Sequence, residues 1–132
     1  MTRPLAKRWP AFGFCLLAGC SSLLDAGGCQ ELVHPALTIE IRELGSGRPL
    51  ADSARGVARA GTFADSLQPY AYEAASGKLY ALQAYGPAGT YRVELQRPGF
   101  QPWAQDNISV TSNRCGDNTV AVRADLVPAA TP

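Results

Sequence analysis

Hydrophobic and polar residues alternate along most of this chain beyond residue 35. Leu37, Ile39 and Ile41 occupy every second position of the segment 36–42, and the positions between them are polar. A period of two is typical of a β-strand with one buried face. The glycines and the proline of 45–49 then predict a turn, because glycine accepts positive φ angles and proline restricts φ.

The same pattern, divided by Gly and Pro, predicts further strands at 54–59, 62–67, 78–85, 90–96, 100–110 (interrupted at 105–107) and 119–126. The segment 78–85 carries apolar residues on both faces, so the sequence leaves open which face is buried. The segment 68–77, with Pro69 and Gly77, predicts the longest loop, and 113–118 predicts a polar turn.

Short strands with turns between them, and no convincing helix in this region, predict one all-β domain over 36–127. We expect an antiparallel, seven-stranded sandwich with Greek-key connections. Residues 128–132 are expected to form a frayed tail.

The first twenty residues have a different character. A head with three basic residues precedes an apolar run at 11–18, as in a secretory signal peptide. The run closes on Leu17-Ala18-Gly19-Cys20, which resembles the lipobox of bacterial lipoproteins. That resemblance implies cleavage before Cys20, lipid on its thiol and an acylated new N-terminus. The alternative is an ordinary signal peptide followed by an unmodified cysteine.

On this interpretation, residues 1–19 are the signal peptide, and 20–35 are the lipidated N-terminus and a tether. The apolar run is shorter than the roughly 20 residues that span a bilayer, so membrane attachment would be by lipid. The residue after Cys20 is Ser21 and not Asp, and in this respect the chain resembles lipoproteins sent to the outer membrane. We therefore expect a protein of the bacterial cell envelope, anchored in the outer membrane and facing the periplasm.

The net charge of the mature chain bears on which partners are expected. Three of the twelve Lys and Arg lie within 1–19, while all eleven Asp and Glu lie beyond it, so the mature chain carries nine basic and eleven acidic residues and a net charge of −2. A chain without a basic excess lacks the electrostatic surface that holds a phosphate backbone. Nucleic acid is therefore not an expected partner.

The four cysteines of the chain divide into two groups. Cys15 would leave with the signal peptide, and Cys20 would carry lipid. In the oxidising setting of an exported protein, the remaining Cys29 and Cys115 are expected to form a disulfide. The Cα atoms of a disulfide lie about 5.5 Å apart, so the starts of the first and last strands must then be neighbours.

Candidates for catalysis and metal binding are few. His34 is the single histidine of the chain, and together with two cysteines it lacks the spacing of a zinc site. A hydrolase that used His34 with Ser21 or Ser22 would need a serine in fixed geometry, and both serines lie in the expected tether. We therefore expect no catalytic residue, no metal and no cofactor.

Aromatic residues in or near the expected loops are the candidates for binding, namely Tyr70, Tyr72, Tyr85 and Trp103. Their rings could stack against sugar rings or contact a protein partner. The alternative is that Trp103 belongs to the core and that the tyrosines cover the edge of the sandwich.

The segment 88–95, followed by Pro98-Gly99-Phe100 and Trp103, resembles the carboxypeptidase regulatory-like domain, a transthyretin-like (prealbumin-like) sandwich. Within this motif Gly89 is expected to let the backbone turn without a Cβ, and Tyr91 is expected to enter the core and to need a partner for its hydroxyl. In a lipoprotein subgroup of that family a His often follows the cysteine before the last strand, whereas this chain has Gly116. The resemblance implies an accessory module without the peptidase.

The sequence therefore predicts a non-enzymatic, membrane-anchored envelope lipoprotein whose sandwich is a binding or structural module with a protein or polysaccharide partner. A carbohydrate-binding module that uses the loop aromatics is the first alternative. A small periplasmic hydrolase is the second.

Overall fold

The computed structural model describes residues 33–130, and within that range it contains strands and no helix. The strands are β1 (Leu37–Glu43), β2 (Arg55–Ala60), β3 (Phe63–Ser66), β4 (Gln68–Tyr72), β5 (Leu79–Ala84), β6 (Gly89–Gln96), β7 (Trp103–Val110), β8 (Ser112–Asn113), β9 (Gly116–Asp117) and β10 (Val120–Leu126). The expected all-β fold is confirmed.

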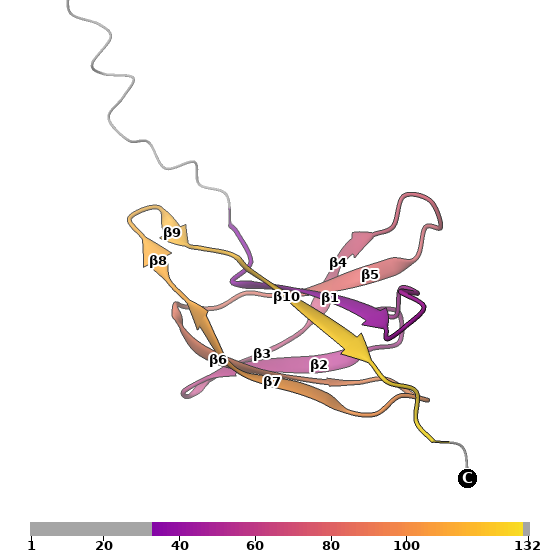
Figure 1. Cartoon of the computed structure of the whole chain (residues 1–132). Coiled ribbons are helices and arrows are strands. Elements are labelled where there is room, and N and C mark those ends of the chain that lie inside the picture. Colours follow the sequence, from indigo (N-terminus) through magenta and orange to yellow (C-terminus); the bar gives the residue numbers. More distant parts are fainter. Residues whose placement is uncertain (1–32, 131–132) are drawn as a thin grey trace, which may run out of the picture.

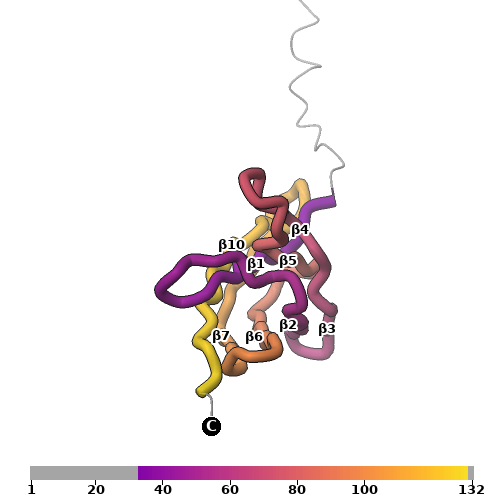
Figure 2. Tube along the Cα trace, turned by 90° about the vertical axis from the view of Figure 1, so that its right-hand side faces the viewer, coloured from indigo at the N-terminus to yellow at the C-terminus, as the bar shows by residue number. Residues whose placement is uncertain are grey.

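Eight of these strands form two stacked sheets, one strand more than the seven expected, because 68–72 forms a strand (Figure 1). Sheet A has the order β10-β1-β5-β4, and sheet B has the order β3-β2-β6-β7. Turning the molecule by 90° shows β3 and β4 following one another along one side of the sandwich, with β7 and β10 towards the other (Figure 2). The remaining two strands, β8 and β9, pair with each other in a small hairpin.

Strand β1 pairs in parallel with β10, whereas every other pair in the two sheets is antiparallel. The expectation of a wholly antiparallel sandwich is therefore wrong in sheet A. The pairing starts with Leu37 beside Val120, so the two strands begin side by side. This is the arrangement of strand starts that the expected Cys29–Cys115 disulfide requires.

Alternation along the strands sends one set of side chains into a core between the sheets. Tyr91 is the largest of the fully buried side chains, and its hydroxyl donates a hydrogen bond of 2.6 Å to the carbonyl of Pro87. The ring of Phe63 meets it edge to face, with centroids 6.3 Å apart. The predicted burial of Tyr91 and the predicted need for a hydroxyl partner are both confirmed.

The first half of the segment 68–77 is strand β4, so the prediction of one long loop there is wrong. Pro69 cannot donate a backbone hydrogen bond, but β4 lies at the edge of sheet A, where a missing donor is tolerated. Only 73–78 forms the connection to β5, closed by hydrogen bonds from the Glu73 amide to the Lys78 carbonyl (2.8 Å) and from the Gly77 amide to the Glu73 carbonyl (2.7 Å).

The buried face of β5 changes along the strand. Leu82 and Ala84 lie in the core, and the register against β4 then shifts twice, as in a β-bulge. Beyond the shift, Leu79 packs against the core and Tyr80 lies on the outer face. The sequence left the orientation of this strand open because neither face is simply apolar.

Strand β7 is also irregular, and here the sequence signal is confirmed. The register against β6 shifts between Tyr91 and Val93, opposite the predicted interruption at 105–107. Asn107 takes a positive φ of 58°, which Asn accepts more readily than most residues. The predicted polar turn at 113–118 makes up most of the β8–β9 hairpin, which begins at Ser112 and has Cys115 in its turn.

Candidate functional site

The outer face of sheet A carries a shallow hollow of about 270 Å³, which we call the sheet A depression. Its lining comes from all four strands of the sheet: Thr38 and Glu40 from β1, Tyr70 from β4, Tyr80 and Ala81 from β5, and Ala121, Val122 and Arg123 from β10. The two alanines flank β1 and leave space between longer side chains. The hollow therefore has tyrosine rings and charged groups around small residues.

The sequence places these side chains outward through the same alternation that builds the core. Thr38 and Glu40 come between the buried residues Leu37, Ile39 and Ile41 of β1. The parallel register then sets Ala121 and Arg123 beside them across the β1–β10 pair. Tyr80 joins the group because the irregularity in β5 turns it away from the core.

Tyr80 is held in place by Arg42. The guanidinium carbon of Arg42 lies 5.1 Å from the centroid of the Tyr80 ring, which is a cation–π contact. Arg42 in turn donates a hydrogen bond to Glu40 and another of 3.0 Å to the carbonyl of Gly47, and its Nη1 lies 3.5 Å from Glu73 Oε2. These contacts hold the Arg42 guanidinium against the Tyr80 ring.

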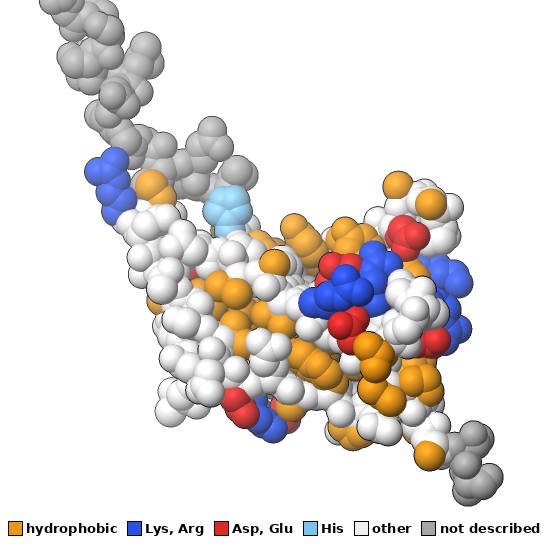
Figure 3. All heavy atoms as spheres, in the orientation of Figure 1, with side chains coloured by type: hydrophobic (Ala, Val, Ile, Leu, Met, Phe, Trp, Pro, Cys, Tyr) orange, Lys and Arg blue, Asp and Glu red, His pale blue; other side chains and the backbone are white. Residues whose placement is uncertain are grey.

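The electrostatics of this cluster are balanced. The hydrogen bond to Glu40 is the main cause that raises the pKa of Arg42 above its ordinary value, against the opposing effect of burial. On the other side of β1, Arg123 donates a 3.0 Å hydrogen bond to Asp125. Figure 3 shows positive and negative side chains interspersed on the part of the surface that carries β1 and the β4–β5 hairpin. The lining of the depression therefore includes both an acidic side chain, Glu40, and a basic one, Arg123.

The four aromatic residues predicted from the sequence do not form one cluster. Tyr70 lines the sheet A depression, and Tyr72 is 63% exposed on the same strand, outside its lining. Tyr85 follows β5, and its amide donates a 3.0 Å hydrogen bond to Asp65 Oδ2. Trp103 begins β7 in sheet B and packs against the core, which is the alternative that the sequence left open.

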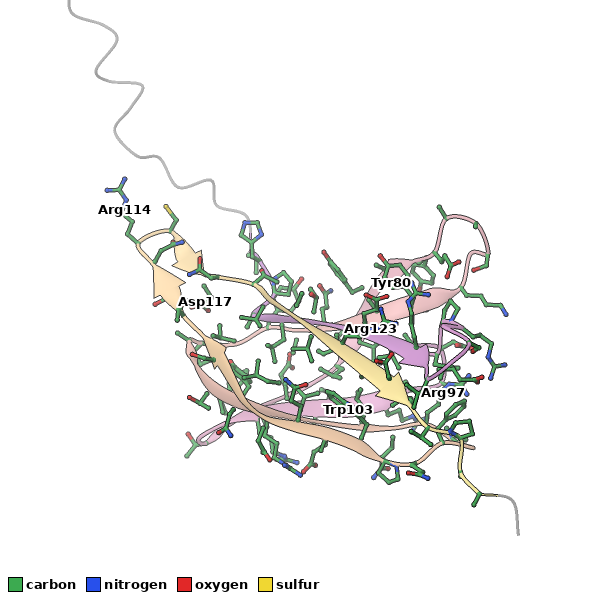
Figure 4. The ribbon with its side chains drawn as sticks, in the orientation of Figure 1. Tyr80, Arg97, Trp103, Arg114, Asp117 and Arg123 are labelled. Carbon is green, nitrogen blue, oxygen red and sulfur yellow. The ribbon has the colours of Figure 1, made fainter. Side chains whose placement is uncertain are left out.

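Tyr80, Arg42, Glu40 and Arg123 were not among the sequence-predicted site residues. Figure 4 shows the labelled Tyr80 and Arg123 at sheet A, with Trp103 at the level of sheet B. Alternation alone places Glu40 and Arg123 on outer faces, but it does not say that β1, β5 and β10 are neighbours. The position of Tyr80 depends on a bulge, for which the sequence carries no clear signal.

A larger hollow, of about 700 Å³, lies at the end of the sandwich where β6 turns into β7. Its main side chain, Arg97, donates hydrogen bonds of 3.0 Å to the carbonyls of Leu50 and Asp52, and its guanidinium lies 5.1 Å from the centroid of the Phe100 ring. Through these hydrogen bonds Arg97 links the β6–β7 turn to the connection that follows β1. We assign it a structural role.

The remaining predicted site residues are the cysteines Cys20, Cys29 and Cys115 and the histidine His34. Cys20 and Cys29 fall outside residues 33–130. Cys115 lies in the β8–β9 turn, where its amide donates a 2.8 Å hydrogen bond to Asn113 Oδ1. The hairpin is at the end of the molecule where the described chain begins (Figure 1). His34 is exposed close to that point.

Two features are absent from residues 33–130. No group of three or more His, Cys, Asp or Glu in this range is arranged to hold a metal ion. In the same part of the chain there is no helix with the length and apolar character needed to cross a membrane.

Comparison with known proteins adds no family assignment. No protein-family model matches the chain, and no curated protein is similar enough to be identified as a relative.

Proposed function

We propose that this chain is a lipid-anchored, non-catalytic protein of the bacterial cell envelope whose β-sandwich is a binding module. The observation that supports binding most directly is the sheet A depression, where Tyr80 is fixed by Arg42 and Tyr70 stands 51% exposed. Ordered aromatic rings with polar groups around them are typical of ligand sites.

The anchor is supported by the lipobox-like Leu17-Ala18-Gly19-Cys20. Twelve residues lie between Cys20 and Val33, where the described domain begins, so the chain takes thirteen residue-to-residue steps from one to the other. A chain of that length reaches at most about 45 Å. This is enough to keep a sandwich domain close to the bilayer while leaving it free to meet a partner in the envelope.

We further propose that the sandwich is a transthyretin-like domain of the carboxypeptidase regulatory-like type. Two features of the resembling segment support this assignment. Tyr91 of β6 is fully buried in the core, and the turn after β6 contains Gly99 at a φ of 83°, a conformation that glycine accepts without strain.

The Cys29–Cys115 disulfide remains part of the proposal. It is supported by the parallel β1–β10 pair, whose strands begin at Leu37 and Val120 side by side. A disulfide at this point would close almost the whole domain into one loop.

Fractionation of a bacterial host that expresses the full chain tests the anchor. We expect the protein in the outer-membrane fraction, with a diacylglyceryl mass on Cys20. Cys20→Ala should move it out of the membrane fraction, whereas Cys15→Ala, a matched change within the signal peptide, should leave the lipidation intact. Recovery of the unprocessed chain in the cytosol would contradict the proposal.

A further inference from the structure

We infer that the sheet A depression binds a neutral sugar ring within a polysaccharide of the cell envelope. The inference rests on the proposed binding function and names its ligand class. Tyr70 and Tyr80 are the stacking residues, and Thr38, Glu40 and Arg123 are the hydrogen-bonding residues.

The aromatic contribution comes from two different strands. A pyranose ring presents C–H groups on its faces, and their slight positive charge is attracted to the negative face of an aromatic ring. Tyr80 is immobilised by the guanidinium of Arg42, so little rotamer freedom is lost when a ligand stacks on the ring. Tyr70, on edge strand β4, offers a second aromatic side chain to the same hollow.

The polar contribution favours a neutral ligand. Glu40 is paired with Arg42, and Arg123 is paired with Asp125. A charged ligand would have to compete with these ion pairs and would bring an ionic group next to a charge of its own sign. Sugar hydroxyls both donate and accept, so they can bond to Thr38, Glu40 and Arg123 while both ion pairs stay in place.

Size and shape indicate a single ring as the unit that is bound. The hollow of about 270 Å³ is smaller than the roughly 300 to 1,000 Å³ of pockets that enclose a drug-sized molecule. It is also open on the outer face of a sheet, so a polymer can continue beyond it on either side. We therefore expect weak binding of single sugars and stronger apparent binding of polymers that offer many equivalent rings.

The test uses the full chain, purified in a polyoxyethylene detergent so that no sugar headgroup competes. The probes are maltohexaose, cellohexaose, a hexamer of N-acetylglucosamine and isolated peptidoglycan, measured by titration calorimetry or sedimentation. We expect at least one neutral probe to bind, and Tyr70→Ala and Tyr80→Ala each to weaken that binding by about tenfold or more.

Tyr72→Ala is the matched control, because Tyr72 is an exposed tyrosine of the same strand outside the lining. It should leave binding unchanged, and Tyr80→Phe should retain most of it. Thermal unfolding of each variant separates loss of binding from loss of fold, and the half-exposed Tyr70 is the safer of the two positions. Arg42→Lys, which keeps the charge but loses the planar contact with the ring, should weaken binding to an intermediate degree.

Three results would overturn the inference. They are no binding to any neutral probe, binding that survives both alanine substitutions, and binding restricted to anionic glycans. Each of these leaves the fractionation result intact, so the anchored envelope protein and its ligand class are tested separately.

Discussion

The hydroxyl of Thr119 donates a hydrogen bond of 2.6 Å to the carbonyl of Pro35, across 84 residues of sequence. The amide of Val120 adds a second bond, of 2.9 Å, to the carbonyl of Ala36. These two hydrogen bonds join the start of β10 to the residues that come directly before β1. The first and last strands of the domain are therefore joined at their starts by hydrogen bonds that do not depend on the proposed disulfide.

Reduction of the proposed disulfide should lower stability strongly. Closing a loop of nearly the whole domain restricts the unfolded chain and is worth at most about 4 to 5 kcal/mol. We expect the thermal midpoint of the protein to fall on addition of reductant, and Cys115→Ser to show the lower midpoint with or without reductant. Mass spectrometry under non-reducing conditions that found both thiols free would refute the pairing.

Removing the hydroxyl of Tyr91 should destabilise the fold without emptying the core. Tyr91→Phe leaves the Pro87 carbonyl without its donor and should cost about 1 to 3 kcal/mol in the free energy of unfolding. Tyr91→Ala adds a cavity and should cost about 3 to 5 kcal/mol. Urea denaturation measures both, and equal stability of Tyr91→Phe and the native chain would show that the bond contributes nothing.

Tyr91 also gives the protein a predicted response to alkaline pH. Burial, and then the negative charges of Asp117 and Asp65, raise the pKa of this hydroxyl above its ordinary value near 10. The folded state therefore holds its proton at a pH where the unfolded chain has released it. The resulting stabilisation is complete below about pH 10 and is lost as the pH rises through the folded pKa.

Denaturation curves between pH 8 and pH 12 test this response. Tyr91→Phe should lose less stability than the native chain over the same pH interval, because it has no proton to release at this site. Parallel loss in the two proteins would exclude Tyr91 as the cause.

Gly56 should not tolerate even a methyl group. A Cβ at this position would lie 2.5 Å from the carbonyl oxygen of Glu94 and 2.6 Å from Leu95 Cδ2, on the strand that pairs with β2. Backbone atoms of a paired strand cannot move away cheaply, so Gly56→Ala should cost about 1 to 3 kcal/mol. Gly89→Ala is the control, because its Cβ would lie 3.6 Å from Ala60 Cβ, an ordinary contact. Similar unfolding midpoints for the two variants would contradict the prediction.

Arg97, in the β6–β7 turn, should contribute more to stability than Arg92 of β6. Arg97→Met removes the donor to two backbone carbonyls and should cost about 1 to 3 kcal/mol. Arg92, in exposed ion pairs with Asp106 and Glu94, provides the comparison. Arg92→Met should change stability by no more than about 1 kcal/mol. The reverse order of effects in a chemical denaturation experiment would contradict the structural role of Arg97.

Strands with one clear buried face could be predicted closely from the sequence. Apolar and polar residues alternate strictly from Leu37 to Ile41 and from Tyr91 to Leu95, and both segments are strands whose apolar residues are buried. Strand β4 was missed, because Pro69 argues against a strand until the edge position of the segment is known.

The structural roles of the glycines could be predicted less well from the sequence than the strands. Gly89 belongs to the family-like motif and was expected to allow a turn, but it begins β6 and has room for a side chain, so that expectation is wrong. The crowded glycines are Gly56, where a Cβ would meet the backbone of β6, and Gly86, where it would meet the Tyr91 hydroxyl and the Phe63 ring. Crowding of this kind depends on which strands and rings approach, and the local sequence does not contain that information.

The candidate site could be predicted only in part, for a related reason. Tyr70 was named from its residue type, but its companions come from β1, β5 and β10, which the chain order separates by up to 85 residues. Their assembly depends on the parallel β1–β10 pair and on the bulge that turns Tyr80 outward. A site made from the outer face of a sheet is therefore visible only once the strand order is known.

The position of β1 has a mechanical consequence. This strand is hydrogen-bonded along both sides, to β10 and to β5, and the described chain leads into it from Val33 at the end of the molecule opposite its C-terminal tail (Figure 1). Tension transmitted through a tether would act along β1 and load many hydrogen bonds in shear at the same time, instead of peeling them apart one by one. A domain attached through this inner strand would resist unfolding under tension better than one attached through an edge strand.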